Sequence, residues 1–130
     1  MFDHTAAMLA FIKLAGVSQS RQQLLPRDKF LMLAAVSAAE AGCPEVAARC
    51  RELIVAHNPA HLIGHHASVE QALMTADFQT YLRQLSRFCS YERAEHLLTQ
   101  LELAPGLPPA SAGLNPAEYA LLLLGNAPGT

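Results

Sequence analysis

Along the chain, apolar residues recur at the three- to four-residue spacing that is typical of amphipathic helices. The clearest examples follow Asp77 and Ser90, each of which is a residue type that caps helices. The first of these two helices is expected to gather its apolar side chains on one face, at Phe78, Tyr81, Leu82, Leu85 and Phe88. The pattern therefore predicts a succession of short helices, each with one face turned to a core.

Capping residues, glycines and prolines divide this pattern into six or seven helices. Thr5 is expected to cap a first helix that Gly16 ends, and Pro26 with Asp28 opens the second helix after a polar connection. The second helix is apolar on nearly every face, which predicts a central position with the others packed around it. The predicted helices cover residues 5–15, 28–41, 44–57, 69–76, 78–88, 91–101 and 117–124.

Residues 30–59 comprise two of these helices, joined by a tight turn at Gly42 and followed by Pro59. With the small residues Ala35 and Ala47 where the two helices would touch, this span resembles a tetratricopeptide-type helical hairpin. Residues that depart from the family's usual large or small side chains are Leu31, Ala38, Pro44, Arg51 and Ile54. The next 34-residue unit does not match the pattern. The resemblance implies stacked antiparallel hairpins, and an irregular helical bundle would explain the same pattern.

Composition supports an all-α fold. The chain of 130 residues holds 23 alanines and 21 leucines but only 5 valines and 3 isoleucines, a ratio that favours helix over strand. One domain is expected at this length. We divide it into a helical domain over residues 1–103, a Pro/Gly-rich tether over 104–113, and a C-terminal helix over 114–125. The last helix is expected to dock on the same domain or on a second copy of the chain.

Charge and cysteine content narrow the functional classes. A net charge of −2 with 15% charged residues does not favour nucleic-acid binding, and no apolar run reaches the roughly 18 residues of a membrane span. Asp3 and Lys13 argue against a secretory signal. The cysteines at positions 43, 50 and 89 have no CxxC spacing, which argues against a disulfide framework or zinc knuckle. We therefore expect a cytoplasmic protein.

A histidine-rich segment is the most unusual local feature, because it holds His57, His61, His65 and His66 within ten residues. On a continuous helix, His61 and His65 would share a face and could bind a metal ion, with His66 or Glu70 nearby as a further ligand. Gly64, which lies between His61 and His65, argues against such a helix, and the segment lacks the HExxH pattern. The alternative interpretation is that these histidines cap helix ends or are solvated.

Signals for catalysis are weak. Cys89 lies near the start of a helix, where the helix dipole would lower the pKa of its thiol, but His96 is too far along the chain to serve as its base. The cysteine at position 50 falls on an apolar stripe, as expected of a core residue. The sequence contains neither a glycine-rich phosphate loop nor a GxSxG motif. We therefore expect no enzyme and no cofactor.

An interaction surface is the remaining hypothesis. Tyr119, Leu122 and Leu123 belong to an apolar C-terminal helix behind the proline-rich tether, and this helix could pack on its own domain, self-associate or bind another protein. Arg83 and Arg87, one helical turn apart, could bind an anion or an acidic partner. The sequence thus predicts a small non-catalytic interaction or assembly module, with metal binding through the histidine segment as the alternative.

Overall fold

The computed structural model describes residues 3–103 and 113–125, and within these residues all regular structure is helical. The predicted all-α class is thereby confirmed. In chain order the elements are α1 (His4–Ser20), α2 (Leu24–Glu40), α3 (Pro44–His57), a 3₁₀ turn η1 (Leu62–His65), α4 (Val69–Ala72), α5 (Ala76–Phe88), α6 (Tyr91–Gln100) and α7 (Pro116–Leu123). The predicted tether, residues 104–113, lies almost wholly outside the described residues.

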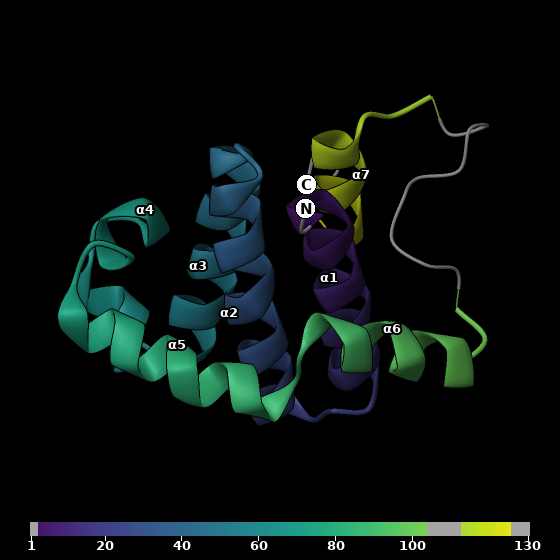
Figure 1. Cartoon of the computed structure of the whole chain (residues 1–130), viewed down its shortest axis with the longest axis horizontal. Coiled ribbons are helices and arrows are strands. Elements are labelled where there is room, and N and C mark those ends of the chain that lie inside the picture. The colour runs from purple at the N-terminus through teal and green to yellow at the C-terminus, as the bar shows by residue number, and fades with distance from the viewer. Residues whose placement is uncertain (1–2, 104–112, 126–130) are drawn as a thin grey trace.

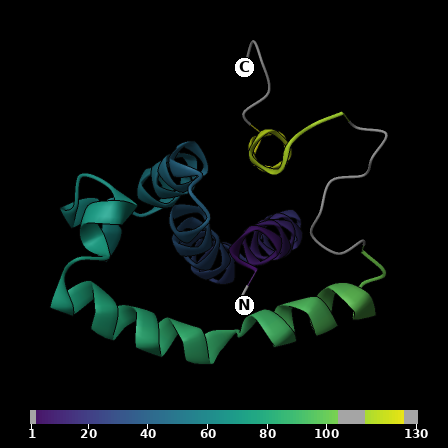
Figure 2. The same ribbon diagram turned by 45° about the horizontal axis from the view of Figure 1, so that its top comes forward.

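The helices surround a central antiparallel pair, α1 and α2 (Figure 1). Helix α3 packs on α2, whereas α5 and α6 lie nearly end to end along one side of the molecule (Figure 2). Helix α7 packs on α1 and α3, on the side away from α5 and α6 (Figure 2). In the described part of the chain, no helix combines the length and the apolar character that crossing a membrane requires.

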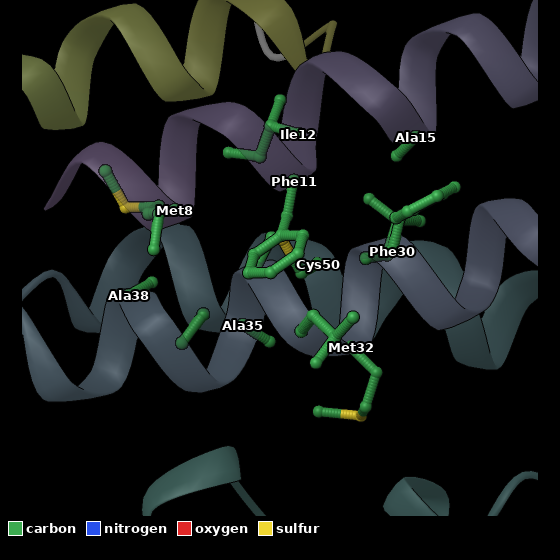
Figure 3. Packing of buried hydrophobic residues seen from close by; sticks show 14 of the residues in the cluster. Met8, Phe11, Ile12, Ala15, Phe30, Met32, Ala35, Ala38 and Cys50 are labelled. Carbon is green, nitrogen blue, oxygen red and sulfur yellow. The ribbon is translucent and has the colours of Figure 1, made fainter. Parts of the chain in front are cut away.

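Close packing of α1 on α2 depends on small side chains. Met8 and Phe11 of α1 point toward Ala35 and Ala38 of α2, and all four side chains are buried (Figure 3). Alanines at a helix contact let the two helix axes approach closely while the large side chains of the partner fill the space between them. Helix α1 is buried on almost every face and shares the central position that the sequence predicted for α2 alone.

Several predicted boundaries are correct because their capping residues act as expected. The side chains of Ser68 and Ser90 accept hydrogen bonds from backbone amides three residues ahead, each at 3.2 Å. Asn115 and Glu118 cap each other's backbone amides and form a complete capping box. Gly42, with φ of +77°, ends α2 in the left-handed conformation that glycine adopts without strain.

The predicted end of the first helix is wrong. Helix α1 continues through Gly16 to Ser20. Its end is made two residues later by Gln22, whose φ is +58°. The amide of Gln22 donates a hydrogen bond to the carbonyl of Gln19, and the amide of Gln23 donates one to the carbonyl of Ser18 at 2.8 Å. These bonds are those of a glycine-type helix end, but a glutamine occupies the left-handed position. The sequence predicts a stop at Gly16, whereas the helix is stopped by Gln22, a residue type that gives no stop signal in the sequence.

Other boundaries shift by a few residues. Asp3 rather than Thr5 caps α1, with its carboxylate 3.0 Å from a backbone amide, and Thr75 rather than Asp77 caps α5. Helix α2 begins at Leu24, two residues before the proline that was expected to open it. Proline is accommodated there because the first turn of a helix needs no backbone donor. Helix α4 stops after about one turn, before its predicted end.

Candidate functional site

The histidine-rich segment does not form the continuous helix that would align two metal ligands. It folds as the 3₁₀ turn η1, and His61 precedes that turn as its capping residue. The Nδ1 atom of His61 accepts a hydrogen bond from the amide of Ile63 at 3.1 Å. A 3₁₀ turn places residues three apart above one another, so His61 and His65, four apart, do not share a face.

Both ring nitrogens of His61 have partners. Because Nδ1 accepts a backbone hydrogen bond, the proton of the neutral ring is on Nε2, which lies 3.3 Å from the hydroxyl oxygen of Tyr81. Burial lowers the pKa of His61, although the negative charge of Asp28 opposes this effect. Burial also raises the pKa of Tyr81 to about 12, and Asp28 adds to that shift. Both directions favour the neutral form of the group at physiological pH, and a neutral His61 is what the hydrogen bond that Nδ1 accepts from the Ile63 amide requires.

The other predicted ligands point elsewhere. His65 and Glu70 are exposed, and the ring of His66 lies edge-on against Phe78 at a centroid distance of 6.1 Å. Over residues 3–103 and 113–125, no three side chains of His, Cys, Asp or Glu are grouped in a way that could hold a metal ion. The geometry therefore matches the alternative interpretation, in which His61 caps a helix end and His65 is solvated.

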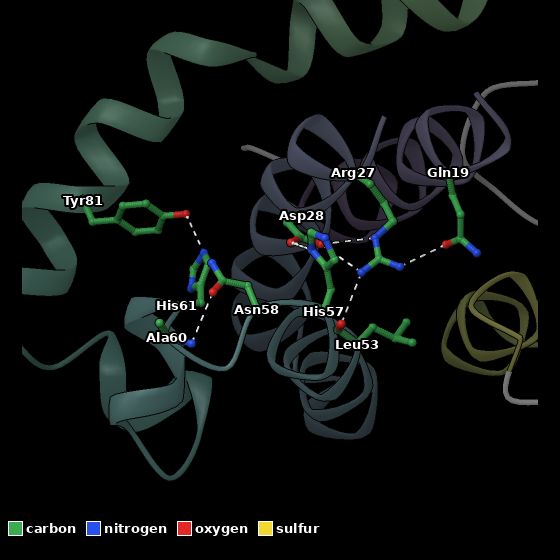
Figure 4. A network of polar contacts seen from close by, with 9 residues as sticks. All are labelled: Gln19, Arg27, Asp28, Leu53, His57, Asn58, Ala60, His61 and Tyr81. Atoms are coloured by element: carbon green, nitrogen blue, oxygen red, sulfur yellow. Dashed lines mark hydrogen bonds and ion pairs between the residues drawn. The ribbon is translucent and has the colours of Figure 1, made fainter. Parts of the chain in front are cut away.

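A buried polar network that the sequence analysis did not anticipate joins α1, α2 and α3 (Figure 4). At its centre the carboxylate of Asp28 accepts hydrogen bonds from Nε and Nη2 of Arg27, at 3.1 and 2.9 Å, and lies 2.6 Å from Nδ1 of His57. Arg27 also donates to Gln19 on α1, at 3.3 Å, and to the backbone carbonyl of Leu53 on α3, at 3.2 Å. We call these five residues the Asp28 network.

The Asp28 network consists of paired charges with little access to water. The side chains of Arg27 and Asp28 are only 9% and 7% exposed, whereas the side chain of His57 is 30% exposed. Removing one partner from a buried ion pair is costly because the other charge stays buried and uncompensated. His57 also lines a shallow groove together with Leu24 and Leu25. The network therefore acts first as a cross-link between three helices.

The thiols lie in surroundings unlike those of a nucleophile. Cys50 is fully buried, and burial raises its pKa to about 12. Cys89 is also buried, and desolvation raises its pKa, with Arg93 opposing the shift. The sequence predicted that the helix dipole would lower the pKa of Cys89. That prediction is wrong in direction, because the side chain packs into the core beside the helix start and loses its water.

The predicted interaction residues fall on two separate surfaces. On α7, Leu122 and Leu123 remain 49% and 40% exposed, while Tyr119 is half-buried with its ring 5.4 Å from the ammonium group of Lys13. Arg83 and Arg87 are exposed on α5, on the other side of the molecule (Figure 2). The structure thus brings the C-terminal apolar residues together but does not bring the arginines to them.

The apolar residues of α7 continue onto the end of α6. Leu103 is 39% exposed and lines a groove of about 430 Å³ together with Tyr119 and Leu123. We call the surface formed by Leu103, Tyr119, Leu122 and Leu123 the α7 surface. Sequence reasoning missed Leu103, because it lies beyond the last turn of its helix and its proximity to α7 depends on the fold.

Comparison of the chain with known protein families, with curated proteins and with solved structures gave no match in any of the three cases. The function must therefore be argued from the residues and their geometry.

Proposed function

We propose that this protein is a non-catalytic helical assembly module that associates with a second copy of itself through the α7 surface. The observation that carries the proposal is the exposure of Leu122 and Leu123, which stay 49% and 40% accessible after α7 has packed on α1 and α3. Adjacent leucines on a helix are exposed at an energetic cost, and contiguous apolar surface of this kind is typical of association sites.

A second copy is the occupant that best fits the position of α7 in the chain. The helix follows a sequence segment, residues 104–113, that contains three prolines, and it contacts its own domain through α1 and α3. An identical docking site exists on every copy, so two chains could exchange their α7 helices without losing a contact. Exchange leaves Leu122 and Leu123 exposed, whereas face-to-face pairing of two α7 surfaces would bury both, and face-to-face pairing is therefore the arrangement that we propose. Both arrangements give a symmetric dimer.

Other features belong to the same proposal. The α2–α3 hairpin, which resembles a tetratricopeptide unit, would serve as part of the scaffold that presents α7. The apolar run Leu31–Val36 of α2 is largely buried in the core and is left out of the proposal. We also propose a cytoplasmic location, because the three cysteines are free thiols.

The test is the mass of the full chain in solution, measured by light scattering over a dilution series. We expect a dimer that dissociates on dilution, and Leu122→Glu should raise its dissociation constant at least about tenfold because a charge would be buried in the interface. Met74→Glu is the matched control, since Met74 is 87% exposed but lies outside the α7 surface. A wild-type monomer at every soluble concentration would overturn the proposal, as would equal effects of the two variants.

A further inference from the structure

An open groove of about 560 Å³ lies between α1, α2, α3 and α7. Its apolar wall includes Ile12, Leu31, Leu53 and Leu123, and the guanidinium-bearing side chains of Arg27 and Arg49 also line it. We call this the Arg49 groove. A volume of this size is in the range of small-molecule sites, which typically combine apolar walls with a few polar groups. In the described part of the chain, its lining contains no acidic side chain.

The floor of the groove includes the backbone of α1 at Gly16. A Cβ atom added at Gly16 would meet no heavy atom within 4 Å, so no side chain of the described residues fills this space. Glycine inside a helix costs about 1 kcal/mol relative to alanine, and no close packing against Gly16 offsets that cost here. The open space over Gly16 therefore extends the groove down to the surface of the helix.

Arg49 has an incompletely satisfied guanidinium. Its Nη1 donates to Glu52 one turn away, whereas its Nε is buried and has no hydrogen-bond partner among the described residues. The Glu52 side chain is 68% exposed, and exposed ion pairs of this kind contribute little stability. A turn of the guanidinium toward the groove would exchange this weak pair for a ligand that accepts from Nε as well.

Arg27 adds a second positive group on the same groove. Its hydrogen bonds to Asp28, Gln19 and the Leu53 carbonyl use four guanidinium hydrogens of the five that arginine carries. The charge of Arg27 is balanced by Asp28, so Arg49 is the stronger anchor for an anion. A ligand that suits this site has an apolar body and one anionic end.

We propose that the Arg49 groove binds an aliphatic carboxylate, with its chain against Ile12, Leu31 and Leu53 and its carboxylate on the guanidinium of Arg49. A planar carboxylate accepts two parallel hydrogen bonds from a guanidinium, which suits a ligand of one negative charge. The proposal goes beyond self-association, because Leu122 does not line the groove and Arg49 does not belong to the α7 surface.

The test is calorimetric titration of the full chain with decanoate below its micellar concentration. Decanol and decyltrimethylammonium serve as probes with the same chain and a neutral or positive end. We expect saturable binding of decanoate at one site per chain, at least about tenfold weaker binding of decanol, and no saturable binding of the cation. Equal affinity for decanoate and decanol would overturn the proposal, as would the absence of saturable decanoate binding.

Three variants locate the site. Arg49→Gln should weaken decanoate binding about tenfold or more, whereas Glu52→Gln should strengthen it by releasing Arg49 from its ion pair. Arg83→Gln removes the same charge from an exposed position on α5 and should change nothing. Unchanged binding by Arg49→Gln would refute the assignment.

A fourth variant blocks the groove without touching its charges. Gly16→Met places a flexible side chain in the open space above α1 and should abolish decanoate binding while the protein stays folded, because methionine is a better helix former than glycine. Full decanoate binding by this variant would show that the chain of the ligand lies elsewhere. The Leu122→Glu variant should bind decanoate like the wild type, so failure of self-association and failure of ligand binding are separate results.

Discussion

Replacing Asp28 with asparagine tests whether the Asp28 network holds α1, α2 and α3 together. The substitution keeps the size of the side chain and one acceptor oxygen but removes the negative charge. In the wild type that charge faces Arg27 at 2.9 and 3.1 Å and the His57 ring at 2.6 Å. After substitution the Arg27 guanidinium, 9% exposed, stays in the core without a counter-charge.

The expected cost follows from that burial. Breaking a buried ion pair by removing one partner costs about 3–5 kcal/mol, because the remaining charge has lost both water and its partner. The lower end of this range applies to Asp28→Asn, since the carboxamide oxygen still accepts a hydrogen bond from Arg27 and the His57 side chain is 30% exposed. We therefore expect a loss of about 3 kcal/mol in the free energy of unfolding, a large fraction of the 5–15 kcal/mol typical of small domains.

Urea unfolding followed by circular dichroism gives this free energy from the midpoint and slope. Glu52→Gln is the matched control, because it removes the same charge from an exposed ion pair and should cost less than about 1 kcal/mol. The double variant Arg27→Met with Asp28→Leu should be less damaging than Asp28→Asn alone, since no buried charge remains. A loss below about 1 kcal/mol for Asp28→Asn would refute the reasoning, as would additive effects of the Arg27 and Asp28 substitutions.

Four further predictions concern the helix ends, the histidine turn and the thiols. Gly16→Ala should stabilise the protein by about 0.5–1 kcal/mol in urea unfolding, since the added methyl group has open space; destabilisation would mean that something packs there. Gln22→Gly should also stabilise it, by up to about 1 kcal/mol, because φ is +58° at that position; a loss would contradict the left-handed helix end. Burial lowers the pKa of His61 from 6.5, so the unfolded state takes up the proton first as pH falls, and stability is lost below about pH 6.5. The variant His61→Asn keeps an acceptor for the capping hydrogen bond but has no group that titrates in this range. Its free energy of unfolding should therefore fall less between about pH 7.5 and 5.5 than that of the wild type. An equal fall would show that His61 does not cause the pH dependence. In the native protein a thiol reagent should label the partly exposed Cys43 well before the buried Cys50, as mass spectrometry of peptides can follow, and equal rates would contradict the burial.

The fold was predictable where local chemistry determines local structure. Ser90 caps its helix as the sequence indicated, because a side chain that bonds to an amide three residues ahead needs no distant contact. The end of α1 was not predictable in the same way. Gly16 has the identity of a stop signal but the environment of a helix interior, whereas Gln22 takes the left-handed position because the chain must turn there to pack α2 on α1.

The candidate sites were less predictable because they depend on contacts between distant residues. His57 and Asp28 are 29 positions apart, and nothing in the local sequence indicates that a helix-opening aspartate becomes a buried partner for a histidine at the end of the next helix. The histidine segment attracted attention through its composition, yet its geometry is determined by the capping bond of His61 to the Ile63 amide. Two adjacent charged residues at the start of an otherwise apolar helix, Arg27 and Asp28, were the one signal in the sequence, and they do not identify His57 as the partner.

Arg27 links the stability of the fold to the proposed ligand site, because it bonds to Asp28 and also lines the Arg49 groove. Leu123 links that groove to the α7 surface in a similar way, since it lines the groove and remains partly exposed on α7. If α7 exchanges between two copies, each groove is completed by Leu123 from the other chain. Because that groove has the same lining as the groove of the monomer, a ligand has equal affinity for the two states and does not shift the equilibrium between them. Decanoate should therefore leave the dimer dissociation constant unchanged, both if the helices are exchanged and if the dimer forms by face-to-face pairing of Leu122, and a lowered constant in light scattering would show that the groove differs between monomer and dimer.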